Sequence, residues 1–141
     1  MSEREYNLKR DMKLAITEIG RDIMFWKVSL GGGSGYRIEI QNDTLLQVRW
    51  NIDSAFFITY TMNSAHIVQT AEFTAPHRYY AAFKGFLDDL LFKFKNSVSE
   101  YDIYYNDDYN ILLQNYEKSP LLKADPHKAI ELYVLKKSII Y

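Results

Sequence analysis

Residues 36–50, YRIEIQNDTLLQVRW, alternate apolar and polar side chains on both sides of the pair Asn42-Asp43. A period of two is typical of a strand that has one buried and one solvated face. Asn-Asp between two such runs favours a tight turn. This stretch therefore predicts two antiparallel strands. Their apolar face would carry Tyr36, Ile38, Ile40, Leu46, Val48 and Trp50.

Further strands are expected on both sides of this hairpin. Residues 24–30 show the same alternation and are followed by GGGSG at 31–35, while residues 55–62 and 65–73 are joined by Asn63-Ser64. Between Trp50 and His77 the chain has only two formal charges, those of Asp53 and Glu72. Either helices cover these strands on both sides, or one face meets another chain.

Helices are expected before and after the strands. Ser2 and Glu5 fit a capping box that opens a helix over residues 3–19. Residues 74–76, Thr-Ala-Pro, would open the longest helix, whose apolar stripe continues to Phe94. Asn106 or Asp107 would cap a short helix. The Asp-Pro pair at 125–126 favours a last helix over a strand, which stays the alternative.

The expected fold is therefore a single α+β domain over residues 1–141. It has an N-terminal helix, an antiparallel meander sheet of about five strands, then a long helix and one or two shorter C-terminal helices.

Composition excludes several classes of site. The 141 residues include no cysteine, which rules out disulfides, a thiolate nucleophile and thiolate zinc ligands. A net charge of −1 excludes a protein surface with a broad excess of positive charge. The charged N-terminus and the absence of a long apolar run predict a cytoplasmic protein without membrane association. Aromatic residues reach 16%, and the residues with AT-rich codons are abundant, which suggests an AT-rich phage, virus or mobile element as the source.

No catalytic, metal or cofactor site is predicted. The three histidines are dispersed, and the adjacent carboxylates of Asp88-Asp89 and Asp107-Asp108 do not converge on a helix. GGGSG lacks the residues of a phosphate loop and indicates a hairpin loop, native or engineered. An enzyme with a site assembled from distant residues remains an alternative. Its candidate residues are His66 or His77 with Asp53 or Glu72.

The least ordinary segment is acidic and rich in tyrosine. No Lys or Arg occurs between Lys95 and Lys118. Tyrosine offers a large contact area at low entropic cost, and carboxylates complement a basic partner. The candidate partner-binding residues are Tyr101, Asp102, Tyr104, Tyr105, Asp107, Asp108 and Tyr109.

The segment predicts a small non-enzymatic accessory factor that binds a protein partner or itself as a homo-oligomer. In the opposing interpretation, the tyrosines pack on the long helix and the acids are solvated.

Single-stranded nucleic acid is the alternative partner. Lys27, Arg37 and Arg49 could share the solvated face of three adjacent strands, where basic and aromatic side chains bind bases and phosphates. Glu39 lies in the same cluster, as is common on a solvated sheet face.

Overall fold

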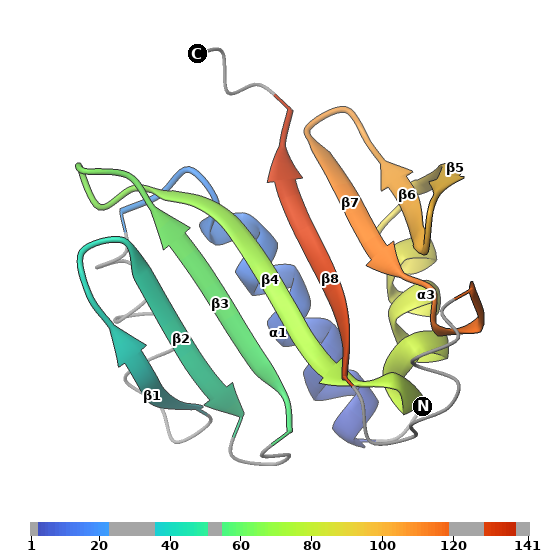
Figure 1. Ribbon diagram of the computed structural model, residues 1–141, viewed down its shortest axis with the longest axis horizontal. Coiled ribbons are helices and arrows are strands. Elements are labelled where there is room, and N and C mark those ends of the chain that lie inside the picture. Colours follow the sequence, from blue (N-terminus) through green and yellow to red (C-terminus); the bar gives the residue numbers. More distant parts are fainter. Residues whose placement is uncertain (1–2, 23–35, 51–54, 119–128, 138–141) are drawn as a thin grey trace.

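The described residues form one antiparallel sheet of eight strands, in the order β1-β2-β3-β4-β8-β7-β6-β5 (Figure 1). The computed structural model describes residues 3–22, 36–50, 55–118 and 129–137. Its helices are α1 (Glu3–Glu18) and α3 (Tyr80–Asp89), with short 3-10 turns η1 (His77–Tyr79) and η2 (Tyr116–Lys118). The strands are β1 (Tyr36–Gln41), β2 (Leu45–Trp50), β3 (Phe57–Met62), β4 (Val68–Pro76), β5 (Lys93–Val98), β6 (Tyr101–Tyr105), β7 (Tyr109–Gln114) and β8 (Ala129–Lys136).

The predicted fold is wrong in its C-terminal half. The expected long helix ends at Asp89, and β5, β6, β7 and β8 follow where one or two further helices were expected. The sheet is therefore an eight-stranded sheet and not a meander of about five strands. The N-terminal helix and the strands β1–β3 lie where the sequence predicts them. Strand β4 continues to Pro76, through the residues 74–76 that were expected to open the long helix, and α3 begins only at Tyr80. The predicted strand at 24–30 and the GGGSG loop lie outside the described residues.

Three of the strands were predicted wrongly from the sequence for identifiable reasons. In β7 the apolar run Ile111-Leu112-Leu113 has no period that separates a strand from a helix. In β6 a buried Asp102 stands on the apolar side and hides the alternation. In β8, Ile130, Leu132 and Val134 do alternate, but the Asp-Pro pair upstream favoured a helix.

The last described strand joins the two halves of the sheet. Strand β8 lies between β4 and β7, with seven residue pairs to β4 and five to β7. Strands β1–β4 form one half and β5–β7 the other, and α3 connects them (Figure 1). The sheet is continuous only because β8 pairs on both sides.

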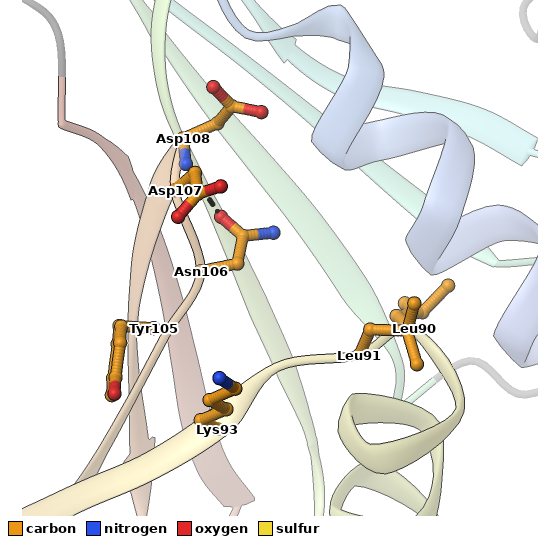
Figure 2. Close-up of a pocket in the computed structure, with 7 residues that line it drawn as sticks. All are labelled: Leu90, Leu91, Lys93, Tyr105, Asn106, Asp107 and Asp108. Atoms are coloured by element: carbon orange, nitrogen blue, oxygen red, sulfur yellow. Dashed lines mark hydrogen bonds between the residues drawn. The ribbon is translucent and has the colours of Figure 1, made fainter.

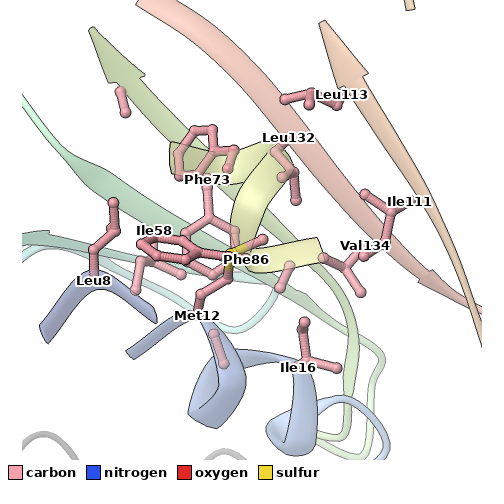
Figure 3. Packing of buried hydrophobic residues seen from close by; sticks show 14 of the residues in the cluster. Leu8, Met12, Ile16, Ile58, Phe73, Phe86, Ile111, Leu113, Leu132 and Val134 are labelled. Atoms are coloured by element: carbon pink, nitrogen blue, oxygen red, sulfur yellow. The ribbon is translucent and has the colours of Figure 1, made fainter. Parts of the chain in front are cut away.

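The core lies between the sheet and the two helices, which cover the same face of it (Figure 1). Leu8, Met12 and Ile16 of α1 pack toward Phe73 of β4 and Phe86 of α3, as Figure 3 shows. These side chains recur at helical spacing on α1, so one stripe of the helix is buried. On the sheet, alternate residues face this core, as the burial of β3 and β8 shows.

Both edge strands are interrupted in the same way. The pairing register shifts between Ile38 and Ile40 in β1, and between Phe94 and Asn96 in β5. A charged residue, Glu39 or Lys95, stands at each shift. Bulges and charges on edge strands hinder pairing with the edge of another sheet.

Candidate functional site

The C-terminus of α3 ends in a Schellman motif. The backbone N–H of Phe92 donates to the carbonyl oxygen of Leu87 at 2.9 Å, and the N–H of Leu91 donates to that of Asp88 at 3.0 Å. Phe92 and Leu87 are both buried, which supplies the apolar contact that accompanies this motif. The motif places Leu91 at the position with a left-handed backbone, and its φ is 65°.

Leu91 is an unusual residue for that position. Glycine usually occupies it, because a left-handed backbone costs an L-residue about 1–2 kcal/mol. The Leu91 side chain is also 81% exposed, so it gains little from burial. Strained residues of this kind concentrate at functional sites. This side chain therefore marks the first part of the candidate site.

The second part is the turn between β6 and β7. The Asn106 side-chain oxygen accepts hydrogen bonds from the backbone N–H groups of Asp108, at 2.9 Å, and Tyr109, at 2.7 Å. The Asn106 N–H donates to the carbonyl oxygen of Tyr109 at 3.1 Å. These bonds fix the turn and leave the side chains of Asp107 and Asp108 exposed.

A pocket of about 350 Å³ lies between these two turns, here called the hairpin pocket (Figure 2). Its floor and walls combine apolar side chains from the end of α3 with polar side chains from the turn. The residues that line it are Leu90, Leu91, Lys93, Tyr105, Asn106, Asp107 and Asp108. Two carboxylates against one ammonium, beside the negative end of α3, give the pocket a negative potential.

The structure divides the predicted partner-binding residues between two faces. Because the segment is a β-hairpin, neighbouring side chains point to opposite sides of the sheet. Tyr105, Asp107 and Asp108 line the hairpin pocket. Tyr101 is half-buried on the sheet face away from the helices, and Tyr109 is half-buried and packs against the core. Asp102 and Tyr104 are buried on the helix side.

Asp102 is a structural residue and not an exposed contact. It is 4% exposed. Its carboxylate accepts hydrogen bonds from Tyr80 Oη at 3.1 Å, Ser97 Oγ at 2.7 Å, Asn115 Nδ2 at 3.0 Å and Lys118 Nζ at 3.0 Å. Burial alone would raise the pKa of Asp102, but these four hydrogen bonds outweigh it and hold the pKa below its usual value. The network joins α3, β5, β6 and η2.

Two of the basic residues predicted to bind nucleic acid, Arg37 and Arg49, lie among the described residues. They do not form a patch of uncompensated positive charge, because both pair with Glu39. Arg37 Nε and Arg49 Nε both donate to Glu39 Oε1, at 2.9 and 2.8 Å. The Arg49 guanidinium also lies 4.0 Å above the Phe57 ring centre. Lys27 lies outside the described residues.

The candidate residues of a dispersed enzyme site lie in different surroundings. The exposed His66 has its Nε2 atom 3.9 Å from Asp43 Oδ1. Glu72 lies on the sheet face without helices, beside Glu131 and Tyr133. Asp53 is not among the described residues, and within the described part of the chain no three His, Asp or Glu side chains gather as metal ligands.

Sequence reasoning missed Leu90, Leu91 and Lys93, which line the hairpin pocket, because no composition signal marks a helix terminus.

Glu72 is expected to make the stability of the protein depend on pH. Burial raises the pKa of Glu72, the Glu131 carboxylate raises it further, and a hydrogen bond from Tyr133 opposes both. A raised folded-state pKa means that stability falls as the pH rises from the ordinary glutamate range through that pKa. Glu72→Gln should therefore increase the free energy of unfolding at neutral pH and change it little at pH 4.

Urea unfolding of both proteins across this pH range would check the expectation. A Glu72→Gln protein that is less stable than the unmodified protein at neutral pH would contradict the expectation. Asp43→Asn, a change at an exposed carboxylate, serves as the control.

No protein-family model, curated protein or solved structure matches this chain. Neither helix of the described residues has the length and apolar character that crossing a membrane requires.

Proposed function

We propose that this chain is a small non-enzymatic accessory factor that binds a protein partner at the hairpin pocket. The contacting segment of the partner would present a Lys or Arg next to a bulky apolar side chain. The apolar side chain would pack on Leu90 and Leu91, and the cation would lie against Asp107 and Asp108. An AT-rich phage or mobile element as the source, and the cytoplasm as the location, belong to the same proposal.

Exposed Leu91 is the observation that carries this proposal. It combines an 81% exposed apolar side chain with a left-handed backbone, so it is unfavourable both for solvation and for conformation. A partner that covers Leu91 would recover the apolar burial, whereas the free protein gains nothing from it. Apolar anchors at the centre of a contact surface usually supply much of the binding energy.

The charges around the pocket favour a basic partner. Asp107 and Asp108 are exposed and are held apart from the core by the turn, so their solvation is largely retained in the free protein. Lys93 is the one cation among the lining residues. Complementary charges of this kind speed encounter and select the partner.

The alternatives have weaker support from the same residues. A single-stranded nucleic acid would meet Arg37 and Arg49 already paired with Glu39, and two further carboxylates, Glu72 and Glu131, stand on that sheet face. A dispersed enzyme site would need His66 to meet a carboxylate other than the exposed Asp43. A protein partner at the hairpin pocket is therefore the function that the geometry favours.

Selection of a displayed random-peptide library against the purified protein tests the proposal. We expect the selected peptides to contain Lys or Arg beside a bulky apolar residue. Affinity for a synthetic peptide of the selected sequence should fall about tenfold or more in Leu91→Asn, which tolerates the left-handed backbone, and in Asp107→Asn with Asp108→Asn. Fluorescence anisotropy of the labelled peptide gives the dissociation constants.

Ile38→Thr is the matched control. Ile38 is also an exposed apolar residue, 44% exposed, but it lies on β1 at the opposite edge of the sheet. Its substitution should leave the affinity unchanged. Selected peptides that bind Leu91→Asn as tightly as the unmodified protein would contradict the proposal.

A further inference from the structure

A second cavity, here called the lysine cavity, adjoins the hairpin pocket. Its volume is about 290 Å³, and the residues that line it are Lys95, Tyr105, Asn110 and Lys137. Tyr105 lines the hairpin pocket as well, so the two cavities meet at this side chain. In Figure 2, Tyr105 lies on the side of the hairpin pocket opposite Leu90 and Leu91. The lysine cavity is therefore reached from the hairpin pocket by moving away from the end of α3.

The two adjoining cavities carry charges of opposite sign. Lys95 and Lys137 are exposed, and neither ammonium forms an ion pair with a carboxylate of the described residues. The exposed carboxylates of Asp107 and Asp108 likewise have no cationic partner in the part of the chain that the structure describes. Acidic and basic groups thus lie in neighbouring cavities without neutralising each other. This arrangement favours a ligand that presents both signs in the complementary order.

The polar groups of the lysine cavity suit a carboxylate. Its ammonium groups and the Asn110 amide are hydrogen-bond donors, and no carboxylate stands among the described residues that line it. Lys137 Nζ lies 4.9 Å from the centre of the Tyr105 ring, which is a cation–π distance. This contact restrains a flexible side chain before any ligand binds. A restrained ammonium loses less conformational entropy on binding than a freely moving one.

The distance between the two cavities sets a spacing in the ligand. Adjoining cavities of about 350 and 290 Å³ have centres about 9 Å apart, which an extended chain covers in two or three residues at about 3.3 Å per residue. Leu90 and Leu91 stand on the side away from Tyr105 (Figure 2). In one bound segment, the apolar residue and the acidic residue therefore lie on opposite sides of the cation.

A peptide fits these charges better than a single-stranded nucleic acid does. A nucleic-acid strand whose phosphates bound Lys95 and Lys137 would bring its next phosphates toward Asp107 and Asp108. Like charges at that distance repel each other. A peptide, in contrast, can change the sign of its charge from one residue to the next.

We propose that the lysine cavity binds an Asp or Glu side chain of the same partner segment that occupies the hairpin pocket. This inference rests on the proposed function and extends it, because it fixes the order of the recognised residues as apolar, basic and acidic. The acidic residue lies two or three positions from the Lys or Arg of the partner. Lys95 and Lys137 then select the direction in which the segment binds.

Peptide selection on two forms of the full chain tests the inference. One displayed random-peptide library is selected on the unmodified chain and on Lys95→Gln with Lys137→Gln, which removes both charges from exposed side chains. Peptides selected on the unmodified chain should carry Asp or Glu at the stated spacing. On the double variant, the preference for Lys or Arg beside an apolar residue should remain, and the preference for the acidic residue should disappear.

A double-mutant cycle measures the contact itself. For a synthetic peptide selected on the unmodified chain, replacing its acidic residue by the corresponding amide should weaken binding about fivefold at low salt. The same replacement should have no effect on binding to Lys95→Gln with Lys137→Gln. Lys84→Gln is the matched control, because Lys84 is an exposed lysine of α3 that lines neither cavity. It should retain the fivefold difference.

The outcomes separate this inference from the proposed function. Peptides that contain the basic and apolar pair without an acidic preference, or with the same acidic preference on the double variant, overturn the inference alone. Peptides without the basic and apolar pair overturn the proposed function and this inference with it. Binding of a single-stranded oligonucleotide that the double variant loses would assign the two lysines to nucleic acid, which also overturns the inference.

Discussion

A chain that ends at residue 128 is expected to lose cooperative folding. It lacks β8, which contributes Ile130, Leu132 and Val134 to the core and pairs with both β4 and β7. Its removal leaves two smaller sheets, each with an unpaired edge next to exposed apolar side chains. The free energy of unfolding of a small domain is only about 5–15 kcal/mol. The burial of three such side chains contributes a large part of it.

Circular dichroism and amide hydrogen exchange would check this expectation. The shortened chain should show no sigmoidal thermal transition and no slowly exchanging amides in β4 or β7. A chain that ends after Lys137 retains β8 and should unfold cooperatively. Cooperative unfolding of the chain that ends at residue 128 would mean that the two halves of the sheet fold independently.

Asp102→Ala is expected to lower the free energy of unfolding by about 3 kcal/mol at neutral pH. The substitution removes the acceptor of four hydrogen bonds and leaves the buried donors of Tyr80 and Asn115 without it. Because the folded-state pKa of Asp102 is lowered, its stabilising effect is present above the ordinary aspartate range. The effect is lost as the pH falls through the lowered pKa.

Urea unfolding at pH 7 and at pH 3 measures this difference. The gap between the unmodified protein and Asp102→Ala should narrow at the lower pH. Asp107→Ala, at an exposed aspartate of the same hairpin, should change stability by less than about 0.5 kcal/mol. A gap that is small at pH 7 would show that the network adds little to the fold.

The sequence predicts the N-terminal half of the fold because its signals there are local. The stripe of α1 and the alternation in β1 and β2 are set by which side chains meet the core. Strand β8 depends instead on partners far away in the chain, since it pairs with Thr70–Pro76 and with Tyr109–Leu113. Nothing in residues 129–136 alone specifies that central place. The Asp-Pro pair upstream favours a helix locally, and the pairing of β8 with β4 and β7 overrides that preference.

The sequence likewise predicts some residues of the candidate site and misses others. Tyr105, Asp107 and Asp108 were predicted from composition, and they do lie together at the hairpin pocket. Asp102 and Tyr104 carry the same composition signal, but the alternation of a strand turns them into the core. The other wall of the pocket was missed because Leu91 occupies a position where glycine is usual. A leucine in an apolar run gives no sign of a left-handed backbone.

The stability of Leu91→Gly measures the conformational strain at Leu91, on which the proposed binding surface depends. Glycine adopts the left-handed backbone without steric cost. We therefore expect the free energy of unfolding of the Leu91→Gly protein to exceed that of the unmodified chain by about 1 kcal/mol. Leu91→Ala keeps the strain and should unfold at nearly the same urea concentration as the unmodified chain. A Leu91→Gly protein that is less stable than the unmodified chain would contradict this expectation, because the leucine side chain would then support the fold instead of being retained for a partner.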